Sequence, residues 1–230
     1  MSSTHIMPAL SGKNKPANEN SKPVSNLGRP TADQAKEIRS RIIHAATLVM
    51  SQKGYAGSSM DDIATAAGVT KRTIYTRFAS KEDVFLALIT ENAAHITNSF
   101  VPPGNIKEPC EYLEEFAWHI LNALLSGQNP ALMKLLASES IRMPVLAEVT
   151  QQSLDQLVSL IQEPLEKIIG KSVDAAYLTW AAEIFIYLVI NPSIGLAICN
   201  KQPPSEDSLR LHNKRAIKLF LNGVRGAADD

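Results

Sequence analysis

Between residues 70 and 77 the chain places positive charge and hydrogen-bonding groups at close spacing. The segment Thr-Lys-Arg-Thr-Ile-Tyr-Thr-Arg holds three cationic and four hydroxyl side chains, and Ile74 is its one aliphatic residue. Cationic and hydroxyl groups bind phosphate oxygens, and several of them also bond the edges of bases. The chemistry that this segment favours is therefore the recognition of a nucleic acid.

The neighbouring residues predict two short helices that would position this segment. Ser59 with Asp62 forms a capping box at the start of the first helix. Gly68 ends that helix, because a residue without Cβ can adopt the left-handed conformation, and Thr70 can cap the second helix. Such a pair has the layout of a helix-turn-helix DNA reader, with Ile74 facing inward. Two surface helices of an unrelated all-α protein would also fit these spacings.

The distribution of charge supports a nucleic-acid partner. The chain has 23 basic and 23 acidic residues, but residues 1–81 hold twelve Lys and Arg against five Asp and Glu, a net charge of +7. Residues 82–230 hold eleven against eighteen, a net charge of −7. The basic segment 1–81 is attracted to the DNA polyanion, and the acidic remainder of the chain is repelled by it. Residues 1–81 are therefore expected to face the duplex.

Residues 37–89 resemble the DNA-binding domain of the TetR (tetracycline repressor) family of bacterial transcriptional regulators. The resemblance rests on residues 42–89, IIHAATLVMSQKGYAGSSMDDIATAAGVTKRTIYTRFASKEDVFLALI. It implies that Lys71, Arg72, Thr73 and Thr76 contact bases in the major groove. Arg72 stands where many members have glycine, so no operator sequence can be transferred from a relative.

The residues predicted to touch DNA extend beyond the second helix of the motif. Thr70, Tyr75 and Lys81 are expected to fix phosphates. Arg29 lies between glycine and proline, a setting suited to an extended arm in a narrow minor groove, although an ordinary linker residue would look the same. The complete predicted set is Arg29, Ser59, Thr70, Lys71, Arg72, Thr73, Tyr75, Thr76, Arg77 and Lys81.

The whole pattern predicts an all-α fold of about nine helices: an N-terminal three-helix helix-turn-helix domain and a larger C-terminal helical bundle. Residues 1–30 are expected to form a disordered basic tail, 31–80 the DNA-binding domain, and 81–230 a helical ligand-binding and dimerisation domain. Thr31 with Gln34 and Ser80 with Asp83 form further capping boxes. Outside the motif, helices are expected at 31–53, 81–100, 109–125, 129–142, 144–169, 173–190 and 205–223.

The segment 175–199 carries one charged residue, Glu183, and is longer than the roughly 20 apolar residues that a membrane span needs. Because Asn191-Pro192 is expected to end the helix and no one-sided basic flank is present, we predict a buried helix and no membrane contact. The family resemblance implies dimerisation through the last two helices, and thus a palindromic double-stranded operator. The predicted dimer interface consists of Trp180, Ile184, Tyr187, Leu209, Ala216 and Phe220.

The resemblance also implies a cavity for an unknown small-molecule effector in the C-terminal bundle. Residues 131–157 further resemble the C-terminal domain of the AefR-like branch of the family. Inward-facing side chains with a polar or polarisable group are the candidates, although aromatic residues at helical spacing also suit a plain core. The predicted ligand-binding set is His95, Tyr112, Phe116, His119, Met133 and Arg142.

No metal site, cofactor or catalytic constellation is expected. Cys110 and Cys199 lack metal-type spacing, and no nucleophile elbow or phosphate-binding glycine loop is present. The prediction is a cytoplasmic, homodimeric transcriptional repressor that a ligand releases from its operator, and not an enzyme. Two alternatives stay open: an activator or global regulator on the same fold, and an enzyme or sensor with an incidental DNA reader.

Overall fold

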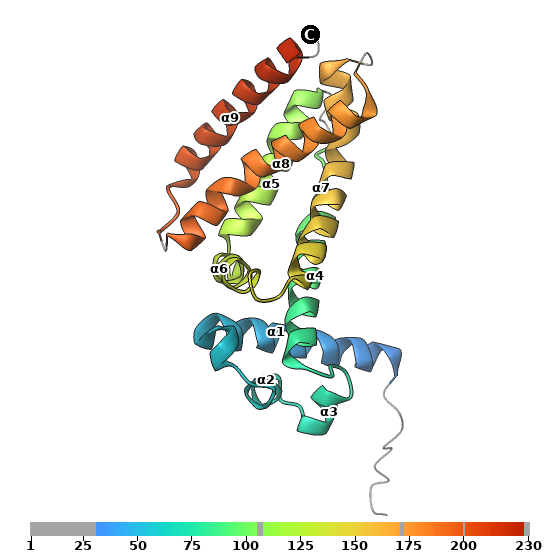
Figure 1. Cartoon of the computed structure of the whole chain (residues 1–230), viewed down its shortest axis with the longest axis vertical. Helices are drawn as coiled ribbons and strands as arrows, with labels where there is room; N and C mark the ends of the chain where they lie inside the picture. The colour runs from blue at the N-terminus through green and yellow to red at the C-terminus, as the bar shows by residue number, and fades with distance from the viewer. Residues whose placement is uncertain (1–30, 105–107, 171–172, 200, 228–230) are drawn as a thin grey trace, which may run out of the picture.

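The computed structural model describes residues 31–104, 108–170, 173–199 and 201–227 of the 230-residue chain. Within these ranges the chain forms nine α-helices and no strand, which confirms the predicted all-α fold (Figure 1). Arg29 and the rest of the predicted tail lie outside the described residues. The helices are α1 (Ala32–Gly57), α2 (Met60–Ala67), α3 (Lys71–Tyr75), α4 (Lys81–Asn98), α5 (Pro109–Leu125), α6 (Asn129–Glu139), α7 (Val145–Ile169), α8 (Ala175–Ile198) and α9 (Glu206–Ala227).

Helices α1, α2 and α3 with the start of α4 form a small head below a larger helical body (Figure 1). The three predicted capping boxes are all present, at Thr31, Ser59 and Ser80. Each capping hydroxyl accepts a hydrogen bond from the backbone N–H three residues on, which satisfies one of the free donors at the helix start. The boundaries of the head helices thus follow from local sequence.

Two buried apolar clusters form the core, and they do not follow the chain in order. The body cluster joins α5, α7, α8 and α9 and includes Phe116 and Phe185. The head cluster joins α1, α2, α3 and α4, and it also contains Leu132 and Leu135 of α6. Helix α6 therefore packs on α1 and shares the core of the head, although it comes after α5 in the chain.

Helix α8 is longer than the sequence indicated, and the predicted end at Asn191-Pro192 is wrong. The helix continues through Pro192 to Ile198. Proline removes the N–H that would bond the carbonyl of Leu188, but Leu188 lies on the exposed side of α8, where water can bond that carbonyl. The buried hydroxyl of Ser193 donates to the carbonyl of Ile190 at 2.7 Å. The loss of one donor is thus tolerated.

The stretch Ala175–Leu196 of α8 would suffice by length and composition to cross a membrane. In the structure α8 packs against α5, α6, α7 and α9. Ala181, Ala182, Phe185 and Ile186 have no exposed surface, so one side of the helix belongs to the core of the body. Burial on this side accounts for much of its apolar composition.

A glycine bends the end of α1 where the sequence predicted a stop. Gly54 has φ 73° and ψ 169°, and one more turn follows it, up to Gly57. No atom lies within 4 Å of a Cβ built on Gly54, so space does not restrict this position; the backbone conformation does. The bend turns Tyr55 toward Phe85 of α4, with ring centroids 5.1 Å apart.

Replacing Gly54 by alanine should destabilise the head. We expect Gly54→Ala to lower the free energy of unfolding by about 1–3 kcal/mol, because an L-residue is strained in this region of φ and ψ. The matched control is Gly57→Ala, whose Cβ would lie 3.6 Å from the Lys53 Cβ, an ordinary contact. Urea denaturation of both variants checks this, and equal stabilities would contradict a strained Gly54.

Candidate DNA-binding interface and ligand cavity

The turn between α2 and α3 is fixed by its own backbone and by one arginine of α1. Gly68 has φ 63° and ψ 38°, the left-handed conformation predicted for it. The N–H of Val69 donates to the carbonyl of Ala64 at 3.0 Å. The Arg41 guanidinium donates to the carbonyls of Ala67 and Gly68 at 2.6 and 3.1 Å. These bonds satisfy the carbonyl end of α2 and hold the start of α3 at a set angle.

Helix α3 is anchored by a buried face and presents the other face to solvent. Ile74 and Phe78 are 0 and 4% exposed and pack in the head core. Thr70 caps the helix by accepting from the N–H of Thr73 at 3.1 Å. The structure brings the predicted base- and phosphate-binding residues of the helix together: Lys71, Arg72, Tyr75 and Thr76 are exposed, and Thr73 and Arg77 are half-buried.

One of these side chains already has an acidic partner. The Lys71 ammonium donates to the carboxylate of Asp61 in the first turn of α2, and both side chains are more than half exposed. The hydrogen bond to Asp61 raises the pKa of Lys71 above its ordinary value. A phosphate or a base edge would therefore compete with Asp61 for this ammonium.

Two predicted DNA contacts serve the architecture of the head. The Lys81 ammonium donates to the carbonyls of Tyr55 and Ser58 at 2.6 and 2.8 Å and lies 4.3 Å from the centre of the Tyr55 ring. It thereby ties the start of α4 to the end of α1. Ser59 caps α2, and hydrogen bonds from Lys53 and Ser59 hold the pKa of Asp62 below its ordinary value. A phosphate contact by Lys81 or Ser59 stays a prediction.

Sequence reasoning missed the roles of Arg41 and Asp61. Arg41 donates to carbonyls 26 and 27 residues further along the chain. Asp61 accepts a hydrogen bond from Lys71, which lies ten residues later in the chain. No local pattern marks either contact, because both depend on how α1, α2 and α3 pack.

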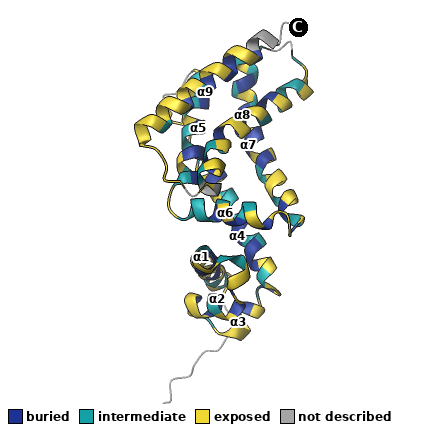
Figure 2. Cartoon of the chain, turned by 60° about the vertical axis from the view of Figure 1, so that its left-hand side comes forward, coloured by how far each residue is buried: buried dark blue, intermediate teal, exposed yellow. Residues whose placement is uncertain are grey.

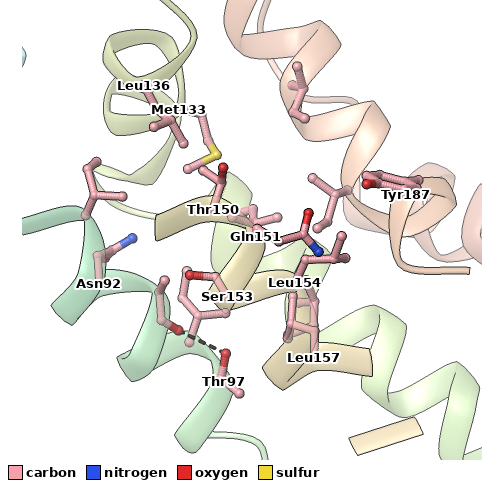
Figure 3. A pocket seen from close by; sticks show the side chains of 17 residues that line it. Asn92, Thr97, Met133, Leu136, Thr150, Gln151, Ser153, Leu154, Leu157 and Tyr187 are labelled. Atoms are coloured by element: carbon pink, nitrogen blue, oxygen red, sulfur yellow. Dashed lines mark hydrogen bonds between the residues drawn. The ribbon is translucent and has the colours of Figure 1, made fainter. Parts of the chain in front are cut away.

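A cavity of about 280 Å³ lies in the body between α4, α5, α6, α7 and α8 (Figure 3). Its wall is mainly apolar, with Met133 and Leu136 from α6 facing Leu154 and Leu157 from α7. Its size lies just below the range that drug-sized ligands occupy. Of the six predicted ligand-binding residues, Met133 lines this cavity.

Three of the other predicted ligand-binding residues gather around Phe100 instead. The rings of Tyr112, Phe116 and His119 lie 5.1–5.4 Å from the Phe100 ring. Tyr112 donates to the carbonyl of Leu160 at 3.1 Å, and burial raises its pKa, with a further contribution from Glu163. The Nε2 atom of His119 lies 3.0 Å from the carbonyl oxygen of Ile96.

The last two predicted ligand-binding residues lie away from the cavity. His95 is exposed on α4. The Arg142 side chain is 73% exposed, and its guanidinium lies 3.9 Å from the carboxylate of Glu139. Glu139 itself is buried at the end of α6. Burial raises the pKa of Tyr55 in the head, and the charges of Glu82 and Glu139 raise it further.

The predicted dimer residues divide between an outer surface and the core. On α8, Trp180, Ile184 and Tyr187 are 51, 39 and 53% exposed. On α9, Leu209 and Ala216 are half-buried and Phe220 packs against Phe185 of the body core. The exposed large apolar residues of α9 are instead Leu211 and Leu219, and much of α9 is exposed (Figure 2).

Tyr187 belongs both to the predicted dimer interface and to the lining of the cavity.

No group of three His, Cys, Asp or Glu in the described part of the chain is placed to hold a metal ion. Cys110 and Cys199 are both free thiols.

An exposed cationic helix fixed in a helix-turn-helix head, joined to a helical body with an apolar cavity, defines a DNA-binding transcriptional regulator. Residues 42–88 match the bacterial regulatory proteins of the tetR family. Residues 111–223 match the C-terminal domain of AefR-like transcriptional repressors, which confirms the resemblance seen in the sequence. The chain belongs to the TetR family.

Relatives and solved structures agree with this assignment. The chain is 26% identical to the transcriptional regulator AcrR of Shigella flexneri over 66% of this chain and 72% of that protein. It is 30% identical to the transcriptional regulator TtgW of Pseudomonas putida over 50% of this chain and 84% of that one. The solved flavonoid-responsive regulator FrrA is 26% identical, with a TM-score of 0.60 over 82% of this chain and 97% of that one. Proteins of this family are transcriptional regulators and not enzymes.

Neutralising Asp61 should weaken discrimination between DNA sequences. In Asp61→Asn the carboxylate that competes with phosphates for Lys71 is gone, so affinity for random duplex DNA should rise by about three- to tenfold at low salt. Affinity for the operator should rise less, because Lys71 loses the partner that orients it. Fluorescence anisotropy with labelled random and operator duplexes measures both.

The control for this experiment is Glu163→Gln in α7, which breaks an exposed pair with Lys167 and makes the same change in net charge. Its effect on DNA affinity should be much smaller, since α7 belongs to the body. An equal gain in both variants would show that only the net charge of the chain matters.

Proposed function

We propose that the protein is a homodimeric repressor that binds a palindromic operator through α3 of each subunit and leaves it when a small molecule occupies the cavity. The single observation that carries DNA binding is the exposed cationic and hydroxyl face of α3. Helix α3 lies in the head, at the end of the described part of the chain that is farthest from α5, α8 and α9 (Figure 1). A helix in this position can enter a major groove without a clash from α5, α8 or α9.

Release by a ligand is supported by the helices that the head and the cavity have in common. Helix α6 turns Leu132 and Leu135 into the head core and Met133 and Leu136 into the cavity. Helix α4 likewise contributes Phe85 to the head core and lines the cavity farther along. Because packed cores shift between discrete arrangements, a ligand that displaces α4 or α6 changes the position of the head.

Dimerisation is supported by the apolar surface of α8 and α9. The large apolar side chains of Trp180, Ile184 and Tyr187 on α8 and of Leu211 and Leu219 on α9 are all exposed, and several such residues on neighbouring helices are typical of an interaction surface. A two-fold interface over α8 and α9 would cover this surface and set two α3 helices on one face of the duplex.

The relatives support the proposal that the protein represses transcription and acts in the cytoplasm. The matched C-terminal domain is that of AefR-like repressors, and FrrA is named for its response to flavonoids. We therefore propose repression relieved by a small molecule, in the cytoplasm where a bacterial operator is accessible.

Selection of genomic fragments by the purified protein should recover a palindromic operator, and loss of two α3 side chains should abolish its recognition. In the double variant Arg72→Ala, Tyr75→Ala we expect operator affinity to fall by about a hundredfold, because the base contact of Arg72 contributes about 1–3 kcal/mol and the phosphate contact of Tyr75 is lost with it. Footprinting measures this loss, and circular dichroism verifies that the helices are intact. Lys134→Ala, in α6, is the control; an unchanged footprint in the double variant would refute the proposed reading face.

A charge at the centre of the proposed interface should separate the subunits. The wild-type protein is expected to sediment as a dimer at micromolar concentration. Trp180→Glu should raise the dimer dissociation constant by about thirtyfold or more, since buried tryptophans are frequent hot spots. Ile141→Glu is the control, because Ile141 is 89% exposed but lies between α6 and α7. A wild-type monomer, or equal effects of both substitutions, would contradict this interface.

A further inference from the structure

The cavity contains no charged group. Seventeen side chains from α4, α5, α6, α7 and α8 line it, and none of them is Asp, Glu, Lys, Arg or His. An ion moved from water into such a wall would lose its hydration without gaining a counter-charge, which costs several kcal/mol. A carboxylate, phosphate or ammonium group is therefore disfavoured inside this cavity.

Most polar side chains of the wall already use their donors within the protein. The hydroxyls of Thr97 and Ser153 donate to carbonyls of their own helices at 3.0 and 2.9 Å, and the first of these bonds is drawn in Figure 3. Thr150 does the same with the carbonyl of Leu146 at 2.9 Å. The Gln151 amide donates to the carboxylate of Asp155 at 2.9 Å. The three hydroxyls therefore offer a ligand little beyond a weak acceptor, whereas Gln151 keeps one N–H and its amide oxygen.

Asn92 differs from them. It lies on the cavity side of α4, on the same stripe as Ile89, Ala93 and Ile96. Within the described residues its amide makes no hydrogen bond to the protein, and the amide points from α4 toward the cavity (Figure 3). A free amide on an otherwise apolar stripe departs from the pattern of a core helix, and it can donate and accept at once.

A second free polar group faces Asn92 from the other side. Tyr187 projects from α8 with its hydroxyl turned to the cavity, and Met133, Thr150 and Gln151 lie between it and Asn92 in the view of Figure 3. Tyr187 is 53% exposed, so it lies at the mouth of the cavity, whereas Asn92 is half-buried. Because most of the lining side chains are apolar, a molecule with a largely apolar body suits the space between the two groups.

We propose that the cavity binds a small, uncharged and largely apolar molecule that places one hydroxyl, carbonyl or amide group against the side chain of Asn92. Asn92 selects the polar group, and the apolar residues of α6 and α7 bind the rest of the molecule. The absence of charge on the wall excludes the anionic form of an otherwise similar compound. This inference rests on the proposed function for its biological meaning, but it concerns binding to the DNA-free protein.

Three aromatic probes of similar size test the inference by titration calorimetry on the full-length protein. Naphthalene has no polar group, 2-naphthol has a neutral hydroxyl, and 2-naphthoate carries a carboxylate at neutral pH. We expect 2-naphthol to bind more tightly than naphthalene, and 2-naphthoate to bind at least about tenfold more weakly than 2-naphthol. Binding of 2-naphthoate as tight as that of 2-naphthol, or no binding of 2-naphthol at millimolar concentration, would overturn the proposal.

The role of Asn92 is tested with a variant that keeps the branched shape of the side chain and removes its polar atoms. Asn92→Leu should weaken 2-naphthol by about three- to tenfold, the effect of one net hydrogen bond, and leave naphthalene unchanged or tighter. Asn98→Leu, an exposed position at the end of α4, is the control and should change neither. Met133→Trp should fill the cavity and block both probes, which locates the site independently of Asn92. An unchanged ratio of 2-naphthol to naphthalene affinity in Asn92→Leu would refute the role of this amide.

Ligand titration and operator footprinting on the same protein distinguish a failure of this inference from a failure of the proposed function. If 2-naphthol binds through Asn92 but the footprint on the operator persists at saturation, ligand-controlled release is wrong and the ligand class stands. If only a charged compound releases the operator, release stands and the ligand class is wrong.

Discussion

The packing of α6 across α1 is the contact on which the relation between head and body depends. Two leucines of α6, Leu132 and Leu135, lie in the same buried cluster as Ile42 and Met50 of α1. The adjacent side of the helix, with Met133 and Leu136, lines the cavity, and Leu136 also packs against the head cluster. Because α6 has eleven residues and its cavity-lining side chains lie next to those in the head core, a shift of the helix at the cavity also shifts its contact with the head. Lys81, bonded to the bend of α1, attaches α4 to the head at a second point.

The sequence was sufficient wherever the structure is decided by near neighbours. Capping boxes join residues three apart, and a left-handed glycine joins adjacent elements, so the sequence alone places Ser59, Gly68 and Thr70 at the helix ends. The end of α8 could not be placed in this way. A proline normally ends a helix, but the penalty at Pro192 depends on whether the carbonyl of Leu188 faces water, and that is a property of the packed body.

The residues that line the cavity could be predicted from the sequence even less well than the end of α8. Tyr112 and His119 were chosen because an aromatic ring with a polar atom suits a ligand, yet both polar atoms bond backbone carbonyls elsewhere in the body. A cavity is space left by several helices together, and no spacing along one helix reveals it. The sign that was available is the interruption of an apolar stripe of α4 by Asn92, and it gains meaning only when the opposite wall is known.

The ion pair between Asp61 and Lys71 has a consequence for how operator binding would be counted. A cationic side chain that reaches a phosphate displaces a condensed counterion from the DNA, and the salt dependence of affinity reports the number displaced. When Lys71 does so, it leaves the carboxylate of Asp61 without its partner and close to the duplex. The negative charge of Asp61 repels the DNA and offsets part of the positive charge that displaces counterions. The slope of affinity against salt would therefore fall short of the number of phosphates that the protein touches.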